Sequence, residues 1–273
     1  MASRSYRSRF INSLAILYVA LIVIYILAPN IIIMIMSFNK AQYFIFPPTG
    51  LSLTWFRRAI STSGWRVAFS NSLVLALITA LVSTALGVLS GLALHRGRFR
   101  GREVFINVFL SPLVMPQLLL GIALLLFLGQ LGLVGSLMPL FLGHVLVTFP
   151  YVLRLILAAL PGVSANVEEA AYSLGADEIT TVLRVTLPII RPAVLSGWMF
   201  AFILSFDNLM ISLFLASARV YTLPVKILET LEWEMDPTVA AVSTIFMLLS
   251  IGLMLILDRT VGLRFDTSIS SRA

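Results

Sequence analysis

The sequence predicts an all-α membrane protein with about six transmembrane helices. Hydrophobic residues make up 59% of the chain and charged residues only 11%, which is far from the balance of a soluble domain. The apolar residues form long continuous runs, without the alternation over about ten residues that marks a β-barrel strand. Because backbone groups in lipid must be paired within their own segment, we expect these runs to be helical.

The apolar runs divide the chain into six expected spans, each long enough to cross a bilayer. The spans cover residues 11–36, 70–94, 104–128, 137–159, 193–217 and 239–258. No half of the chain looks soluble, so we expect residues 1–273 to form a single polytopic transmembrane domain. The first run is too long for a signal peptide and lacks a convincing cleavage site, which predicts a retained helix.

The distribution of basic residues predicts that both termini are cytoplasmic. Lysine and arginine collect in short inside loops, and with an inside N-terminus 13 of the 19 fall in inside segments. The densest run is HRGRFRGR at 95–102. Such a run could suggest nucleic-acid binding, but insertion of two neighbouring spans already requires a basic loop there. We therefore expect the lipid bilayer, and no nucleic acid, as the partner of this run.

The longest polar interruption in the second half is an inside loop at about 160–191. Asn166 and Glu169 have the spacing of a capping box, which would begin a short helix. Gly175 is placed to end this helix in the left-handed conformation. The loop is therefore expected to start with a short, capped helix.

A second short helix is expected after the first. Asp177 can cap it, and it must stop before Pro188. Four of its residues share one face, namely Ile179, Val182, Leu183 and Thr186. The two helices would form an amphipathic hairpin along the cytoplasmic surface, and on periodicity alone such a hairpin could simply cover the ends of the spans.

The spacing within this loop resembles the EAA loop in permease subunits of binding-protein-dependent ABC importers. Glu-Ala-Ala is followed by three residues and a glycine, then by nine residues, a branched apolar residue, one residue and Leu-Pro. The branched residue is valine, where the family usually prefers isoleucine. The matching residues are Glu169, Ala170, Ala171, Gly175, Val185, Leu187 and Pro188.

Within this superfamily the chain looks most like the polyamine-type permeases. The matching stretches are Ser37-Phe38-Asn39, Thr54-Trp55-Phe56, the Arg-Gly-rich second loop, SPLVMPQLLLG at 111–121 and SFDNLMISLF at 205–214. Relatives often carry two acids where this chain has Asp207-Asn208. This departure weakens any inference about the solute, so a polyamine such as putrescine or spermidine remains beside other small organic solutes, such as an amino-acid derivative or an anion.

The resemblance implies a type I ABC importer permease fold and a division of labour. A second permease subunit would complete the pathway, two copies of an ATP-binding subunit would lie beneath it, and an extracytoplasmic or periplasmic binding protein would deliver the solute. ATP and Mg would be bound by the partner ATPase, so this chain is expected to have no cofactor, no catalytic residue and no enzymatic activity. It indeed lacks a G-x-x-x-x-G-K-[ST] phosphate loop.

The resemblance also implies a place and a role for the inside loop. The chain would lie in the bacterial cytoplasmic (inner) membrane, and the loop would couple the spans to the ATPase. The implied coupling residues are Glu169, Ala170, Ala171, Gly175, Leu187 and Pro188. Glu169 is then interpreted as a cap or a contact to the ATPase, and not as an acid–base catalyst.

Asp207 lies near the middle of the expected fifth span, where a buried acid normally faces protein or water. It is either a pathway residue, which meets a cationic solute group or helps to gate the cavity, or a structural partner hydrogen-bonded to a neighbouring helix. Ser205, Asn208 and Ser212 form a polar stripe from which Asp207 is turned by about 160°. Either Asp207 or the stripe lines the pathway, unless the helix is locally unwound. A proton-coupled secondary transporter using Asp207 is the rival hypothesis, but it gives no reason for the EAA spacing.

The remaining polar and small residues in the spans have structural interpretations. His144 has no second histidine nearby, and the chain contains no cysteine, so no metal site is expected. His144 is interpreted as a satisfied donor between helices. Ser83, Gly87 and Gly91 are spaced four apart and predict a close-packing seam. Kinks are expected at three prolines, Pro29, Pro112 and Pro116.

The last outer segment, TLPVKILETLEWEMDP at 222–237, has the pattern of a surface helix. Leu228, Leu231 and Met235 share one face, which is expected to be buried. The acids Glu229, Glu232 and Asp236 line an adjacent face. These acids, with Glu234, form either a solvated surface or a site that docks the binding protein or draws a cationic solute inward.

Overall fold

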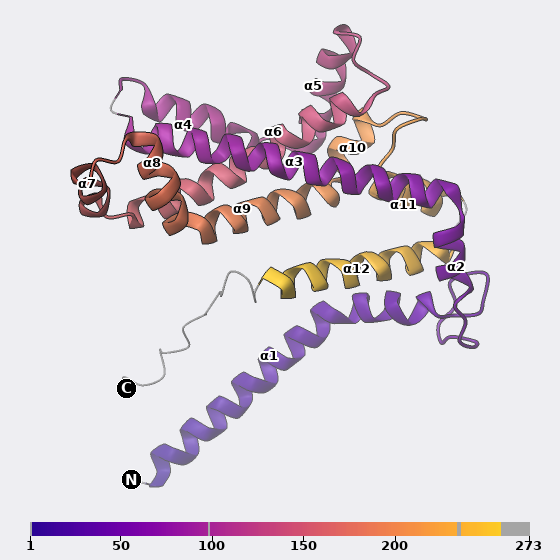
Figure 1. The fold of residues 1–273 in the computed structure, drawn as a ribbon. Coiled ribbons are helices and arrows are strands. Elements are labelled where there is room, and N and C mark those ends of the chain that lie inside the picture. The colour runs from indigo at the N-terminus through magenta and orange to yellow at the C-terminus, as the bar shows by residue number, and fades with distance from the viewer. Residues whose placement is uncertain (1, 98, 234–235, 258–273) are drawn as a thin grey trace. The chain divides into compact units, whose positions relative to one another are not determined.

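The computed structural model describes residues 2–97, 99–233 and 236–257. Its regular secondary structure over these residues is helical, and one isolated bridge joins Asn39 to Leu51. The all-α class is therefore confirmed. The chain divides into two compact units, Met1–Thr62 with Thr230–Leu253 and Ser63–Glu229 with Met254–Ala273, and each is described by itself (Figure 1).

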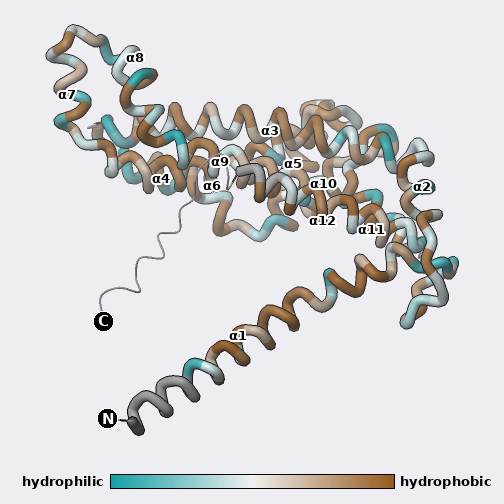
Figure 2. Tube along the Cα trace, turned by 60° about the horizontal axis from the view of Figure 1, so that its bottom comes forward, coloured by the Kyte–Doolittle hydropathy of each residue, from teal (hydrophilic) through white to brown (hydrophobic). Residues whose placement is uncertain are grey.

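The first unit contains α1 (Ala2–Ser37), α2 (Thr54–Ser61) and α12 (Thr238–Leu257) up to Leu253. Residues 12–37 of α1 are long and apolar enough to cross a membrane, and their hydrophobic colour dominates this helix in Figure 2. α12 begins after Asp236, whose carboxylate accepts hydrogen bonds from the backbone N–H and the hydroxyl of Thr238 at 2.8 and 2.7 Å. Asp236 thus caps the helix that corresponds to the expected sixth span, although residue 258 lies outside the described residues.

The second unit is built around three long helices: α3 (Ser63–Arg96), α6 (Leu137–Ala159) and α9 (Leu187–Phe206). Each packs against the other two (Figure 1). α5 (Gln117–Gln130) packs against α10 (Leu209–Leu215) beside them. The fully apolar part of this interior comprises Leu75, Leu128, Leu140, Val147, Ile211 and Leu215.

The small-residue seam predicted on α3 is confirmed, and it faces α6. A Cβ atom on Gly87 would lie 2.7 Å from Val152 Cγ1, and one on Gly91 would lie 2.6 Å from Ile156 Cγ2. Both distances are too short for a real Cβ contact, so only glycine lets the two backbones approach this closely. One turn earlier, Ser83 completes the seam with a hydrogen bond to Thr148.

Four described helical segments are long and apolar enough to cross a membrane: Asn12–Ser37, Ser63–Arg96, Leu137–Gly162 and Glu178–Phe206. The expected third span is instead a pair of helices, α4 (Arg102–Leu110) and α5, bent by 101°. Pro112 lies within the 3-10 turn η1 (Ser111–Leu113) between them, and Pro116 precedes α5. The prolines therefore produce a break here, a larger effect than the expected kink.

The fifth span expected over 193–217 is interrupted, which matches the alternative of a locally unwound helix. α9 ends at Phe206 and α10 begins at Leu209, so the fifth span is broken at Asp207-Asn208. Asn208 has extended backbone angles and its side chain caps α10, which gives the second half a start of its own.

The expected stop before Pro188 is wrong. α8 (Glu178–Thr181) runs through the π turn η3 (Val182–Thr186) into α9, where Pro188 occupies the first turn. The backbone N–H of Leu187 bonds to the carbonyl of Val182, five residues earlier. This wider turn accommodates a proline, which has no N–H and whose ring crowds the preceding turn, so the helix continues past it.

Candidate functional site

The inside loop forms the expected pair of short helices, α7 (Ala165–Ser173) and α8, at one end of the second unit (Figure 1). The predicted capping box is wrong, because Asn166 lies inside the first turn of α7. Ser164 takes the N-cap position, with extended backbone angles and no side-chain cap bond. Shifting the start to Ser164 puts Glu168 in the first turn, where a carboxylate interacts favourably with the helix dipole.

The predicted end of α7 is confirmed. Gly175 has φ +87°, which is the left-handed conformation that glycine adopts without strain. Its N–H bonds to the Tyr172 carbonyl at 2.9 Å, and the N–H of Ala176 bonds to the Ala171 carbonyl at 3.1 Å. These are the two bonds of a Schellman motif. Gly175 therefore sets the direction in which the chain leaves α7.

The predicted cap of the second helix is confirmed as well. The carboxylate of Asp177 accepts a hydrogen bond from the backbone N–H of Thr180 at 2.9 Å. Side-chain and backbone hydrogen bonds from Thr180 hold the pKa of Asp177 below its ordinary value. The turn between α7 and α8 is thus closed on both sides by local bonds.

The residues matched to the EAA pattern lie mostly on the surface of this hairpin. Four are exposed and three are half-buried; the exposed ones are Glu169, Ala170, Gly175 and Pro188, and the others are Ala171, Val185 and Leu187. Within the described residues the Glu169 side chain forms no hydrogen bond or ion pair. The predicted shared face is split, because Ile179 and Leu183 are 69% and 59% exposed whereas Thr186 is buried. Together with Leu174, which is 89% exposed, they leave an apolar surface on the hairpin.

Glu168, and not Glu169, makes the internal contacts of α7. Its Oε1 accepts hydrogen bonds from Arg96 Nη2 at 2.5 Å and from the Thr186 hydroxyl at 2.5 Å. Partial burial raises the pKa of the Glu168 carboxyl, but the bonds from Thr186 and Arg96 and the charges of Arg96 and His95 outweigh it. The pKa of Glu168 therefore lies below its ordinary value.

The polar stripe of the fifth span faces the interior of the unit. His144 on α6 lies between two serines, with Nδ1 2.8 Å from Ser205 Oγ and Nε2 3.0 Å from Ser212 Oγ. The interpretation of His144 as a satisfied partner between helices is confirmed. The described residues contain no group of three or more His, Cys, Asp or Glu that could hold a metal.

Asn208 and Asp207 diverge at the break of the fifth span. Asn208 is 8% exposed; its Oδ1 accepts from the N–H of Ile211 at 2.9 Å, and its Nδ2 donates to Gln117 Oε1 at 3.3 Å. Asp207 is exposed, at the end of α9. The local break therefore separates an internal stripe from an outward carboxylate. That any of these residues lines a pathway stays a prediction.

The first outer loop brings two of the quoted motifs together. Asn39 is buried, and its carbonyl accepts a 2.7 Å bond from Trp55 Nε1. Its side-chain amide donates to the Ile45 carbonyl and accepts from Ala41 and Thr49. Asn39 thus fixes the path of the loop between α1 and α2.

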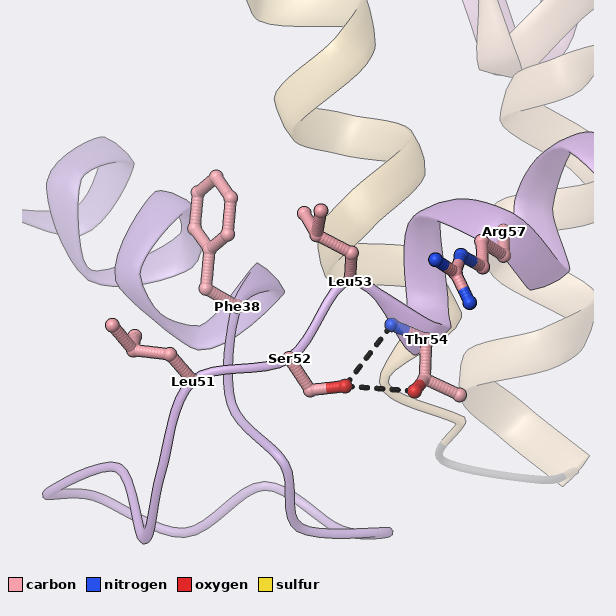
Figure 3. A pocket seen from close by; sticks show the side chains of 6 residues that line it. All are labelled: Phe38, Leu51, Ser52, Leu53, Thr54 and Arg57. Carbon is pink, nitrogen blue, oxygen red and sulfur yellow. Dashed lines mark hydrogen bonds between the residues drawn. The ribbon is translucent and has the colours of Figure 1, made fainter.

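A shallow, open depression of about 400 Å³ lies beside this loop. Figure 3 shows Phe38 from the end of α1 and Arg57 from α2 on either side of Leu53. Ser52 Oγ bonds to the backbone N–H and hydroxyl of Thr54, at 3.1 and 2.7 Å. The depression is formed by short-range structure and contains no buried, unpaired polar side chain.

The last outer segment forms α11 (Leu223–Trp233), but its predicted faces are partly wrong. Leu231 is 40% exposed, so it does not join a buried stripe. Asp236 is 8% exposed and pairs with Arg58 at 3.2 Å besides capping α12, so it does not belong to a solvated acidic face. Glu229 bonds to Lys226 at 3.0 Å. Two further residues of this prediction, Glu234 and Met235, lie outside the described residues, as does Arg98 of the basic run.

The decisive comparison is with a family of transport proteins. The model of the binding-protein-dependent transport system inner membrane component matches residues 83–265, more than half of the chain. The chain belongs to this family. The matched range includes the hairpin of α7 and α8, the broken fifth span and the glycine seam of α3.

Proteins similar to this chain support a transport role. The spermidine/putrescine transport system permease protein PotC of Haemophilus influenzae is 32% identical over 249 residues, which cover 91% of this chain and 96% of that protein. The putrescine transport system permease protein PotI of Escherichia coli is 31% identical over 230 residues, covering 82% of each chain. A probable molybdenum ABC transporter permease of Haloferax volcanii is 35% identical over 59% of this chain and 62% of that protein.

Solved structures agree on the fold. A bacterial ABC transporter that imports alginate superposes with a TM-score of 0.70 at 20% identity, covering 94% of this chain and 97% of that one. The MetNI methionine ABC transporter superposes with a TM-score of 0.55 at 18% identity, covering 73% of this chain and 97% of that one. These structures show the type I ABC importer permease fold, and the family match makes the chain a membrane transport subunit. It is not an enzyme, and ATP hydrolysis belongs to a separate subunit.

The sequence did not reveal the partners of Arg96, Glu168 and Thr186 in this permease. Arg96 is 72 residues from Glu168 along the chain. The spacing from Asn166 to Glu169 predicted that Glu169 makes the internal contacts, whereas Glu168 makes them. A hint was available, since Glu168 precedes the EAA residues by one position and would point to a different side of the same helix.

Proposed function

We propose that this permease forms half of the solute pathway of a binding-protein-dependent importer and couples to its ATPase through the hairpin of α7 and α8. The observation that carries this proposal is the continuity of α8 with α9. Glu178–Phe206 is one helical segment that joins the hairpin directly to the fifth span. A rigid-body displacement of the hairpin would therefore be passed to that span without an intervening flexible loop.

The surface of the hairpin supports an ATPase contact. Glu169 and Ala170 are exposed, and the apolar side chains of Leu174, Ile179 and Leu183 have no cover within the described residues. Exposed apolar side chains at a hairpin tip with a polar rim are typical of a protein interface. The proposed assembly contains a second permease subunit, two ATP-binding subunits that bind ATP and Mg, and an extracytoplasmic binding protein. Both termini and the hairpin would then lie in the cytoplasm, in accord with the basic inside loops.

The proposed solute is a polyamine such as putrescine or spermidine. The named relatives PotC and PotI support this class. The exposed carboxylate of Asp207, at a break within the fifth span, supports it independently, because an acid at membrane depth is favoured where it meets water or a cation. Asn208 and the two serines of the stripe would hold this break in place, with Asp207 as the group that meets the solute.

Uptake measurements test the solute. Radiolabelled putrescine and spermidine would be followed in cells that produce the permease with its partner subunits, using the wild type, Asp207→Asn and the control Glu103→Gln. Loss of one charged contact predicts about a tenfold fall in uptake for Asp207→Asn. Glu103 is an exposed acid on α4, so its variant should transport normally. Normal uptake by Asp207→Asn, or uptake restricted to neutral or anionic solutes, would reject the polyamine assignment.

Co-purification with the ATP-binding subunit tests the coupling surface. A Cβ on Gly175 would meet no atom within 4 Å, but its φ of +87° makes any side chain strained, so Gly175→Val perturbs the turn without creating a clash. Gly162 is a matched control, since a Cβ there also meets nothing within 4 Å and its backbone is ordinary. We expect Gly175→Val to lose the ATP-binding subunit and Gly162→Val to retain it. Equal retention by both variants would argue against a contact at the hairpin.

A further inference from the structure

α7 is held in place by little apolar packing. None of its residues is buried, although it carries the EAA residues. Apolar helices in the same unit, such as α6, bury many side chains against their neighbours. Some other interaction must therefore fix the position of α7, since a short helix of nine residues is not stable in isolation.

That interaction is a cluster of three side chains from three different elements. Arg96 comes from the last turn of α3, Glu168 from the first turn of α7, and Thr186 from the π turn that leads into α9. All three pairs are bonded: Arg96 to Glu168 and Thr186 to Glu168 at 2.5 Å each, and Arg96 Nη2 to Thr186 Oγ1 at 3.0 Å. We refer to these residues as the Arg96–Glu168–Thr186 cluster.

The surroundings of this cluster make it stronger than an ordinary surface ion pair. Thr186 is 1% exposed, and the side chains of Arg96 and Glu168 are only 23% and 21% exposed. Exposed pairs contribute little because water and salt screen them, whereas partly buried, charge-assisted bonds are shorter and stronger. The second guanidinium nitrogen, Nη1, also lies 3.6 Å from Glu178 Oε1 on α8. One arginine at the end of α3 therefore contacts both helices of the hairpin.

The geometry also links α7 to two long helices at once. The Thr186 hydroxyl donates to Glu168 and can accept from Arg96, so a single side chain satisfies both charged partners. Because Thr186 lies in the π turn just before α9, displacement of α7 pulls on the start of the fifth span as well as on α3. The cluster is thus a junction between α7, α3 and α9.

We propose that the Arg96–Glu168–Thr186 cluster is a positioning site that locks α7 to the ends of α3 and α9, so that the hairpin and both long helices move as one body. The effect of this lock on transport rests on the proposed function, because there the hairpin is the part that contacts the ATPase. Its mechanical part concerns this chain alone and is measured without transport. Removing the cluster would let α7 move separately from the spans.

Spin-label distances test the mechanical part. The chain has no cysteine, so labels at Leu89→Cys on α3 and Ser173→Cys on α7 are the only ones attached. Both sites are exposed. The double electron–electron resonance distance distribution of the purified chain in lipid nanodiscs is expected to be narrow, and to broaden in Glu168→Ala and in Thr186→Val. Asn166→Ala is the matched control, an exposed α7 residue without a side-chain hydrogen bond to the described residues, and it should leave the distribution narrow.

Coupling is measured in the complex with the ATP-binding subunit and binding protein. Loss of the cluster is expected to raise the ATP hydrolysed per solute transported about fivefold, the low end of the usual range of coupling between sites. The amount of assembled complex should stay unchanged. The charge-swapped pair Arg96→Glu with Glu168→Arg should restore part of the coupling that either single variant loses, which a purely structural defect would not show.

The outcomes separate the two proposals. Unchanged distance distributions in Glu168→Ala and Thr186→Val overturn the positioning site, whatever the transport data show. A fall in assembled complex that parallels the fall in uptake, with no rescue by the swap, overturns it too, because the cluster would then only stabilise the fold. Broadened distances in a chain that transports no solute and binds no ATPase would uphold the lock and refute the proposed function.

Discussion

The hydrogen bonds of His144 give the sharpest test of how the broken fifth span is held. One imidazole joins α6 to both halves of that span, through Ser205 at the end of α9 and Ser212 on α10. In a neutral ring one nitrogen donates and the other accepts, so both serines can be satisfied together. The perturbation is His144→Leu, alone and combined with Ser205→Ala or Ser212→Ala.

The magnitude follows from the number of bonds. Side-chain hydrogen bonds between membrane helices contribute about 0.6 kcal/mol on average and at most about 1.7 kcal/mol. Two bonds therefore predict that His144→Leu lowers the free energy of unfolding by about 1.2 to 3.4 kcal/mol. Each double-mutant cycle should show a coupling energy of about 0.6 to 1.7 kcal/mol, since the residues are in direct contact.

The assay is reversible unfolding in mixed micelles with increasing sodium dodecyl sulfate, followed by circular dichroism. Ser196→Ala serves as the control, because Ser196 lies on the same helix as Ser205 and forms no hydrogen bond with the described side chains. Its cycle with His144→Leu should be additive. Additivity in the cycles with Ser205 and Ser212 would refute the reasoning, since the serines would then be no more coupled to His144 than Ser196 is.

Three further predictions concern the packing seam, the start of α12 and the hairpin. Gly87→Val should destabilise the chain by about 1–3 kcal/mol through overpacking against Val152, and Val152→Ala should recover part of this loss in the double variant, as measured by thermal unfolding. Asp236→Ala should lower the free energy of unfolding by about 1 kcal/mol, because it removes the carboxylate that caps α12 at Thr238. Asp236→Asn should lower this free energy less, because an amide caps equally well. Equal losses in the two variants would contradict the capping role. The pKa of Glu168 is lowered from 4.5 in the folded state, so its charge stabilises the fold above pH 4.5, and this contribution is lost as the pH falls through the folded-state pKa. Wild type and Glu168→Gln should therefore differ in melting temperature at pH 7 and converge only once the pH has fallen below that lowered pKa.

Local signals were the part of this structure that the sequence could predict. Gly175 and Asp177 each act within a few residues, through a backbone conformation and a single cap, and both lie where their chemistry requires. The helical class follows from the apolar runs in the same way, since they are continuous, lack the alternation of barrel strands and must pair their backbone groups within the segment. The glycine seam of α3 was also visible, because a repeat of small residues indicates a close approach whatever the partner helix is.

The sequence allowed a local break in the fifth span but could not decide for it, and it gave no sign of the long-range pairs. Hydropathy averages over a window, so the apolar residues on both sides of Asp207 conceal the end of α9. The cap at Asn208 was a local cue, but an asparagine in an apolar run also suits a continuous helix. The partners of Glu168 are 72 and 18 residues away, and no pattern within one sequence shows which distant side chains meet.

The breaks in the third and fifth spans are joined by a hydrogen bond between their residues. A break inside the membrane leaves backbone groups that lipid cannot satisfy, so neighbouring residues must pair them. Asn208, at the break of the fifth span, caps α10 and donates to Gln117, the first residue after the break in the third span. An amide can accept and donate at once, whereas a carboxylate at this 8% exposed position would only accept and would carry a charge into the interior. Asparagine at 208 therefore has a structural role at the break, distinct from the solute contact that we propose for its exposed neighbour Asp207.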